Sequence, residues 1–215
     1  MTAIFITASG TGIGKTFVAE VLIRQRREEG REVAAIKPVV SGFDPGRVRE
    51  SDTGRLIAAL GLELTAQNIN LMSPCRYAAP LSPDMAAARE GKTVPYDEVV
   101  AYCRAVIEDC EASGGTLLIE GIGGVMVPLD GTRTVVDLIA DLGIPAVLVS
   151  GSYLGALSHT LTAHAVLVAR GIPVEGIIVS ETEGSEVPID ETREVLERFA
   201  APTPVHVFPF VEHRA

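Results

Sequence analysis

A glycine-rich loop near the start of the chain most constrains the fold. It reads Ala-Ser-Gly-Thr-Gly-Ile-Gly-Lys-Thr over 8–16, between an apolar strand pattern over 3–7 and a helical pattern over 16–29. Glycines let backbone N–H groups turn inward around phosphate oxygens, and the helix start that follows adds partial positive charge. Lys15 could then reach the β- and γ-phosphates of a nucleotide, and the Thr16 hydroxyl could hold Mg²⁺.

The order of strand, loop and helix therefore predicts a P-loop, although Ser9 stands where the strict motif has glycine. Two alternatives remain at this point. One is a plain glycine-rich turn, and the other is a dinucleotide-binding loop, which would give the Lys-Thr pair no role.

Short apolar strands and amphipathic helices alternate along the rest of the chain. Further strands are predicted over 33–37, 116–120, 146–150, 174–180 and 205–208, and further helices over 51–60, 96–110, 155–170 and 189–199. Strands that are apolar on both faces form a parallel sheet with helices on both faces. We therefore expect a single domain over residues 1–215, with an α/β P-loop NTPase-like fold and a mainly parallel central sheet.

Composition and charge narrow the class of partner. The formal net charge of −10 disfavours nucleic acid, and 47% hydrophobic residues argue against disorder. The apolar runs are too short to cross a membrane, and the amino terminus lacks a signal-peptide pattern. We expect no nucleic-acid or membrane partner and a cytoplasmic protein, in which Cys75, Cys103 and Cys110 are free thiols.

Charged residues follow the predicted strands at the edge where the ligand of such a sheet binds. Lys37 ends the second strand, Asp52 starts the next helix, and Glu120 closes the strand over 116–120. Mg²⁺ prefers carboxylate and phosphate oxygens, so the two acids are candidate metal ligands. The alternatives are a plain helix cap for Asp52, an exposed strand end for Glu120 and a surface charge for Lys37.

The ordered set of motifs resembles the dethiobiotin synthetase family. The set comprises T-G-x-G-K-T over 11–16, K-P-V-x-S-G over 37–42, Ser51-Asp52, a proline-rich stretch over 77–83 with Glu90-Gly91, E-G-I-G-G over 120–124 and L-G-A-L-S-H over 154–159. The resemblance implies a homodimeric cyclo-ligase of biotin biosynthesis that uses ATP and Mg²⁺. Its substrates would be 7,8-diaminononanoate and CO₂ or bicarbonate, joined through a carbamate and a carbamic-phosphoric anhydride.

The resemblance also implies roles for individual residues. The catalytic set would be Lys37, Lys15, Thr11 and Ser41, and the Mg²⁺ ligands Thr16, Asp52 and Glu120. The nucleotide would contact Gly12, Ile13, Gly14, Lys15, Thr16, Phe17, Asp52, Glu120, Gly121, Ile122, Gly123, Ser180, Pro209, Phe210 and Val211. The substrate would contact Thr11, Lys37, Ser41, Tyr153, Gly155, Ala156, Leu157 and Ser158, with Gly155 to Ser158 supplied by the partner subunit.

Two rival functions stay open. A P-loop regulatory ATPase that switches its partner or dimer state would share the loop and the strand-end acid, but it would not need Lys37 and Ser41 or the helix start at Gly155. A non-catalytic P-loop domain of a larger enzyme is the second rival. The preferred base is also open, because Ser180 stands where the family has asparagine, and ATP is the default.

Overall fold

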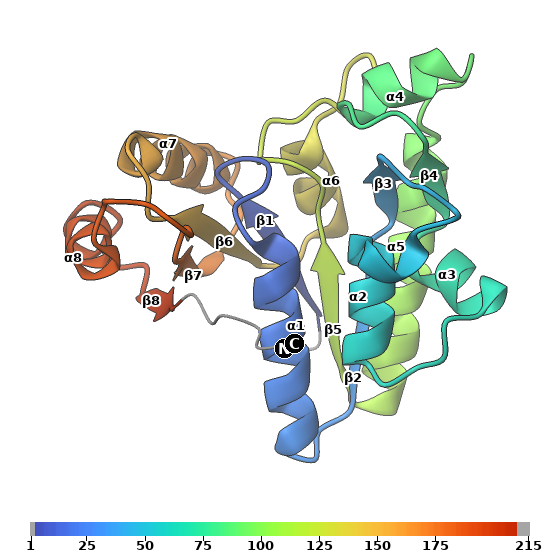
Figure 1. The fold of residues 1–215 in the computed structure, drawn as a ribbon, viewed down its shortest axis with the longest axis horizontal. Helices are drawn as coiled ribbons and strands as arrows, with labels where there is room; N and C mark the ends of the chain where they lie inside the picture. The colour runs from blue at the N-terminus through green and yellow to red at the C-terminus, as the bar shows by residue number, and fades with distance from the viewer. Residues whose placement is uncertain (1–2, 210–215) are drawn as a thin grey trace.

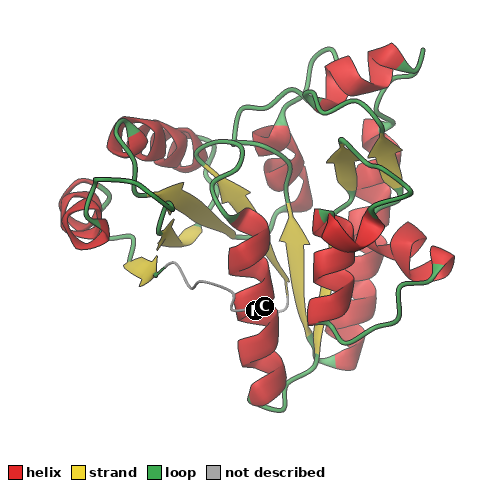
Figure 2. Ribbon diagram, viewed as in Figure 1, coloured by secondary structure: helices red, strands yellow, loops and turns green. Residues whose placement is uncertain are grey.

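A central parallel sheet organises the computed structural model, which describes residues 3–209. Within that range the sheet has six strands in the order β2-β5-β1-β6-β7-β8, and every neighbouring pair is parallel. The strands are β1 (Ala3–Ala8), β2 (Val33–Ile36), β5 (Thr116–Glu120), β6 (Ala146–Gly151), β7 (Val174–Ser180) and β8 (Val205–Phe208). The predicted fold class is confirmed (Figure 1, Figure 2).

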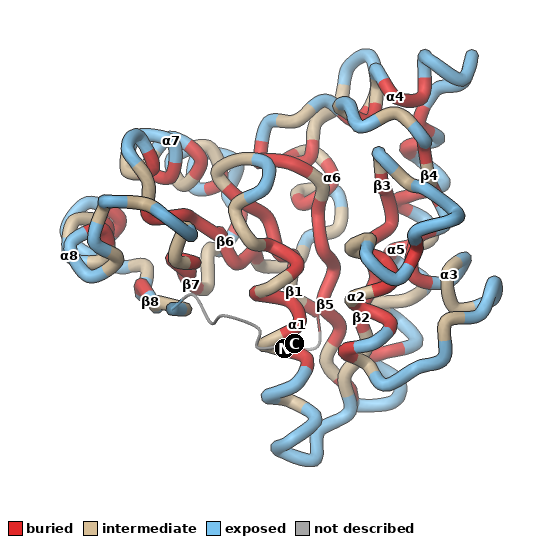
Figure 3. Tube along the Cα trace, viewed as in Figure 1, coloured by how far each residue is buried: buried red, intermediate tan, exposed pale blue. Residues whose placement is uncertain are grey.

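Helices cover both faces of this sheet, because the strands bury side chains on both sides. On β1, Phe5 belongs to one apolar cluster and the next residue, Ile6, to another. The Ile6 cluster includes residues of α1 (Lys15–Glu28), α2 (Asp52–Ala59) and α3 (Ala66–Met72). The Phe5 cluster includes residues of α4 (Pro83–Arg89), α5 (Tyr96–Ser113), α6 (Val135–Leu142), α7 (Ala156–Ala169) and α8 (Ile189–Phe199). Figure 3 shows the buried strands between exposed helix surfaces.

A small second sheet extends the carboxyl-end rim beside β2. Its strands, β3 (Val39–Ser41) and β4 (Cys75–Tyr77), pair in parallel, and a short 3₁₀ helix covers Val48–Glu50. The N–H of Lys37 donates to the carbonyl of Met72 at 2.8 Å, which ties the end of β2 to this region. Elements β3, β4, α3, α4 and α6 were not predicted from the sequence. The second sheet brings Ser41 to the same rim as the loop after β1.

Element ends differ from the predictions by a few residues. The second strand stops at Ile36, one residue before Lys37, and the helix predicted over 96–110 continues to Ser113. No helix within residues 3–209 is both long and apolar enough to cross a membrane. The three cysteines are free thiols, all buried.

Candidate active site at the phosphate loop

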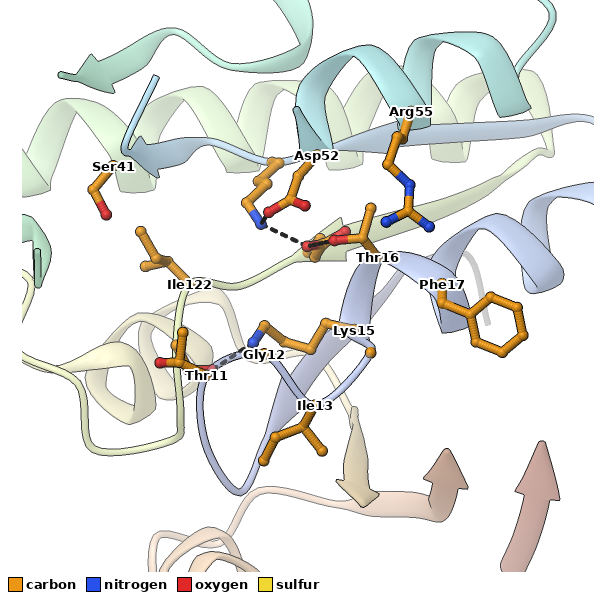
Figure 4. Close-up of a pocket in the computed structure, with 14 residues that line it drawn as sticks. Thr11, Gly12, Ile13, Lys15, Thr16, Phe17, Ser41, Asp52, Arg55 and Ile122 are labelled. Atoms are coloured by element: carbon orange, nitrogen blue, oxygen red, sulfur yellow. Dashed lines mark hydrogen bonds and ion pairs between the residues drawn. The ribbon is translucent and has the colours of Figure 1, made fainter. Parts of the chain in front are cut away.

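A pocket of about 310 Å³ lies at the carboxyl ends of β1, β2 and β5 (Figure 4). The loop after β1, the start of α2 and the segment after β5 supply most of its wall. Its lining residues are Thr11, Gly12, Ile13, Gly14, Lys15, Thr16, Phe17, Lys37, Ser41, Asp52, Arg55, Glu120, Ile122 and Gly123. All of these except Arg55 are site residues expected from the sequence, so the fold brings most of that set into one cavity.

The glycine-rich loop adopts a backbone that side chains would obstruct. Gly12 and Gly14 have φ angles of 73° and 95°, in the left-handed region that favours glycine. A Cβ at Gly14 would lie 2.7 Å from the Oγ of Ser180, which is buried at the end of β7. Ser180 therefore lies against the loop backbone, and the close approach requires glycine at position 14.

Lys15 points its amine into this pocket. Its Nζ donates to the carbonyl of Gly123 at 2.8 Å and to that of Gly10 at 3.3 Å. Only 7% of the residue is exposed. Burial, with the positive charge of Lys37 as a second cause, lowers the pKa of Lys15 to about 8. Its charge at neutral pH is thus available to an anion that displaces the two carbonyls.

Lys37 links the two candidate carboxylates. Its Nζ donates to Oδ2 of Asp52 at 2.5 Å and to Oε1 of Glu120 at 2.6 Å. Lys37 is 3% exposed and Glu120 1%. Burial alone would lower the pKa of Lys37, but Glu120 and Asp52 together raise it, so the amine is charged. Burial alone would raise the pKa of Asp52, but Lys37 holds it below its ordinary value.

The structure does not support the alternatives raised for these three residues, which were a plain helix cap for Asp52, an exposed strand end for Glu120 and a surface charge for Lys37. Ser51 caps α2, because its side chain accepts a hydrogen bond from the N–H of Gly54, and Asp52 is the first helical residue. The Asp52 carboxylate is therefore free to turn toward Lys37. Glu120 and Lys37 are both buried rather than exposed at a strand end.

The oxygen atoms here fit a magnesium ion. The Thr16 hydroxyl donates to Oε1 of Glu120 at 2.8 Å, and the amine of Lys37 donates both to that oxygen and to the Asp52 carboxylate. The other oxygen of Glu120, Oε2, is buried and has no hydrogen-bond partner among the described residues. An orphaned buried carboxylate oxygen is costly unless a cation accompanies it.

Between residues 3 and 209 no group of three or more His, Cys, Asp or Glu side chains is arranged to hold a metal. Mg²⁺ does not require such a group, because it is commonly held by one or two carboxylates and completed by substrate phosphates and water.

Arg55 is the lining residue that the sequence motifs did not indicate. It lies one turn after Asp52 on α2 (Figure 4). Its guanidinium is paired with Glu20 of α1. Its spacing from Asp52 places it on the same helix face, but no motif marks it as a site residue.

The residues expected at the substrate carboxylate lie elsewhere. Tyr153 and 155–158 are at the start of α7 and do not line this pocket. Gly155 is the helix cap, with φ 98°, and the Tyr153 hydroxyl is 3.1 Å from Nδ1 of His159. The expected carboxylate-binding set therefore does not line the pocket that holds Lys15 and Lys37 in its own chain.

Two further nucleotide-contact predictions, Gly121 and Pro209, do not line this pocket. Gly121 lies under the pocket, where an added Cβ would be 2.7 Å from the Phe5 ring. Pro209 is exposed at the end of the described range. Phe210 and Val211 fall outside the described residues.

Comparisons with known proteins agree with this geometry. A family model described as an AAA domain matches residues 2–212. An ATP-dependent dethiobiotin synthetase from Acidiphilium cryptum is 47% identical, over 97% of this chain and 92% of that protein. Proteins of the same description from Phenylobacterium zucineum and Methylobacterium nodulans are 42% and 43% identical, over 100% and 93% of this chain and 92% and 90% of theirs.

Solved structures share the fold at low identity. The MinC:MinD cell division protein complex of Aquifex aeolicus has a TM-score of 0.57 at 14% identity, covering 99% of this chain and 83% of that one. A ParA family ATPase of Chlorobium tepidum has a TM-score of 0.54 at 15% identity, with 98% and 85% covered. These likenesses show the P-loop NTPase fold alone. The identity to the curated relatives goes further, and it shows that this chain belongs to the family of ATP-dependent dethiobiotin synthetases.

Proposed function

We propose that this protein is an ATP-dependent ligase that forms dethiobiotin from 7,8-diaminononanoate and CO₂. The observation that carries the proposal is the position of Lys37. Its buried amine lies between Asp52 and Glu120, in the pocket that the phosphate loop lines. A simple nucleotide switch has no need of this second buried lysine, whereas a ligase must join two anions.

The chemistry begins with two reactants that repel each other. One amine of the substrate adds to CO₂ and loses a proton, which gives a carbamate. A carbamate oxygen attacks the γ-phosphorus and expels ADP, and the product is a carbamic-phosphoric anhydride. The second amine attacks the carbonyl carbon, loses a proton and expels phosphate, which closes a cyclic urea. The carbamate and the triphosphate are both negative, so the attack needs positive charge around the transferred group.

Residues of this pocket can supply that charge. Lys15 lies within the glycine-rich loop and would contact the β- and γ-phosphates once they displace the carbonyls that it now binds. Lys37 lines the same pocket, as does Ser41 in the chain's small second sheet. Thr11 and Ser41 can donate hydroxyl hydrogen bonds to the carbamate within this cavity.

Magnesium would be held by Thr16, Asp52 and Glu120, with phosphate oxygens as the remaining ligands. When bound, it supplies a Lewis acid that neutralises charge on the transferred phosphate. Lys37 now occupies the point between the two carboxylates. It would have to release at least one of them, which would leave its amine free to face the carbamate.

The substrate carboxylate is proposed to bind at the start of α7 in a partner protomer. A helix amino terminus presents free N–H groups and partial positive charge to a carboxylate. Gly155 to Ser158 form such a start, and Gly155 and Ser158 are exposed. Because this segment does not line the phosphate-loop pocket of its own chain, a homodimer in which each site uses both chains accounts for the arrangement.

A product assay tests the proposal directly. The purified protein is incubated with diaminononanoate, bicarbonate, Mg²⁺ and ATP, and dethiobiotin and ADP are measured by mass spectrometry. We expect equimolar products, and neither product when the diamine or bicarbonate is omitted. A series of nucleoside triphosphates measures the base preference. ADP release that a protein partner stimulates without any dependence on the diamine would instead support a regulatory ATPase.

A further inference from the structure

We propose that Arg55 and Glu20 form an ion pair that fixes the spacing between Thr16 and Asp52, and so positions the magnesium ligands. Neither residue was expected at the site from the motifs. The inference rests on the proposed function only in that a metal binds with the nucleotide.

The pair is bidentate, and its carboxylate is buried. Nε of Arg55 donates to Oε1 of Glu20 at 2.9 Å, and Nη2 donates to Oε2 at 2.8 Å. The Glu20 side chain is 7% exposed and that of Arg55 38%. Two parallel bonds between a planar guanidinium and a carboxylate restrict orientation as well as distance, which a single bond to a lysine would not do.

Its place along the two helices links it to the metal ligands. Glu20 lies four residues after Thr16 on α1, and Arg55 lies three residues after Asp52 on α2. Residues three and four apart lie on the same helix face. The ion pair therefore crosses from α1 to α2 one turn below the point where Thr16 and Asp52 approach each other. Figure 4 shows the Asp52 and Arg55 side chains descending from α2 toward Thr16.

Asp52 needs such support more than the other proposed ligands do. Its side chain is 43% exposed, and it is the first residue of a helix of eight residues. Glu120, by contrast, closes a central strand and is 1% exposed. Magnesium requires nearly ideal octahedral geometry at about 2.0–2.1 Å, so a small displacement of one carboxylate weakens binding.

Helix packing alone does not account for the pair. Ile23 of α1 and Leu56 of α2 belong to one apolar cluster, and Arg27 at the far end of α1 donates to the carbonyl of Ala59 at 2.7 Å. These contacts already hold α1 against α2 away from the pocket. A buried ion pair adds little net stability compared with an apolar pair of similar volume. What it adds here is a fixed geometry at the pocket end of the two helices.

The test compares variants at the two ends of the helix pair. Glu20→Gln keeps the shape and removes the charge, and Arg55→Lys keeps the charge and removes the fork. Arg27→Gln is the matched control, since it breaks an α1–α2 contact away from the pocket. Mn²⁺, an octahedral substitute for Mg²⁺ with the same preference for oxygen ligands, is titrated by electron paramagnetic resonance into protein saturated with a non-hydrolysable ATP analogue. Urea unfolding of each variant is measured in parallel.

Outer partners of metal ligands typically change metal affinity by about 10- to 100-fold when they are removed. We expect Glu20→Gln and Arg55→Lys each to raise the Mn²⁺ dissociation constant about tenfold or more. The double variant should be no worse than the weaker-binding single, because either change already breaks the pair. Arg27→Gln should lower the unfolding midpoint and leave Mn²⁺ affinity unchanged.

Unchanged Mn²⁺ affinity in folded Glu20→Gln and Arg55→Lys would overturn the proposal, and so would an equal loss in Arg27→Gln. The measurement does not involve the diamine or bicarbonate. A protein that shows the metal effect but makes no dethiobiotin would therefore keep this inference and remove the proposed function. A protein that makes dethiobiotin but shows no metal effect would remove this inference and keep the proposed function.

Discussion

Replacing Lys37 with glutamine is the sharpest perturbation of this site. In the structure its side chain is 4% exposed, and its amine bridges the carboxylates of Asp52 and Glu120. Glutamine is uncharged, and its amide group can donate a well-aligned hydrogen bond to only one of the two carboxylates. The variant therefore leaves two carboxylates at one point with no cation between them, and that of Glu120 is buried.

The cost in stability can be estimated from this geometry. Removing one partner of a buried ion pair typically costs about 3–5 kcal/mol, because an uncompensated charge stays behind. Asp52 is 43% exposed and water screens it, so the lower end of this range applies, about 3 kcal/mol. The cost in turnover is separate. One preorganised group at a developing charge is worth about 10²- to 10³-fold in kcat, so we expect Lys37→Gln to lose roughly 10²-fold or more.

Magnesium separates the two effects. A divalent cation can take the place of the lost amine between the carboxylates, so Mg²⁺ should raise the urea midpoint of Lys37→Gln more than that of the wild type. Turnover should not return, because the metal cannot also provide the amine that we propose to face the carbamate. Urea unfolding with and without Mg²⁺, together with steady-state ADP release, measures both quantities.

A matched control is Lys92→Gln. Lys92 pairs with Glu90 at 2.7 Å on the surface, so its loss removes a lysine–carboxylate contact far from the pocket. Unfolding and turnover should hardly change. Near-normal turnover of folded Lys37→Gln would remove Lys37 from the mechanism. Unchanged stability without Mg²⁺ would refute the buried bridge itself.

Changes at other residues of the chain lead to independent predictions. Gly14→Ala should weaken ATP binding by about tenfold or more in calorimetry, because its Cβ would lie 2.7 Å from the Ser180 hydroxyl at a φ of 95°; normal affinity would contradict the loop geometry. Glu120→Gln should lose Mg²⁺ dependence and activity together, and an unchanged metal titration would reassign the ligand. Lys15, with its pKa lowered to about 8, is charged below that pH and neutral above it. ATP affinity should therefore fall as pH rises above 8, with proton uptake on binding, and a flat profile up to about pH 9.5 would contradict this. Burial raises the pKa of Cys103 to about 12, so its thiol should resist alkylation at pH 8 until the protein unfolds.

Local patterns were enough to predict the central sheet. The strand ending near Ala8 and the helix starting near Thr16 both lie within one residue of the observed bounds, because apolar periodicity and the glycine loop fix them. Among the missed elements, β3 and β4 differ from α6 in whether the sequence could have predicted them. Strands β3 and β4 have three residues each and exist only through pairing with each other, which is a tertiary contact. Helix α6 could have been predicted from the sequence. Thr134 and Asp137 have the spacing of a capping box, in which Asp137 accepts a hydrogen bond from the N–H of Thr134, and Gly143 ends the helix.

Part of the candidate site could also be predicted from local sequence patterns. Charged residues just beyond buried strands meet at one rim, so the sequence pattern alone could place Lys37 and Glu120 together. Asp52 was ambiguous, and the helix cap at Ser51 resolves it. Arg55 and Glu20 could not be found from motifs. Each lies one turn beyond a motif residue, and their partnership depends on how α1 packs against α2.

The charges around the pocket bear on the form in which the nucleotide would bind. Among the described residues that line it or pair with its lining residues, the cations are Lys15, Lys37 and Arg55, and the carboxylates are Glu20, Asp52 and Glu120. With all six groups ionised, the side-chain charges cancel. A free triphosphate would then be drawn in only by the loop N–H groups and the start of α1, within a protein whose net charge is −10. A Mg²⁺ ion that entered with the triphosphate would lower its charge and could be held by Asp52 and Glu120. From this balance of charges we expect the metal–nucleotide complex, rather than the free triphosphate, to be the species that binds this pocket.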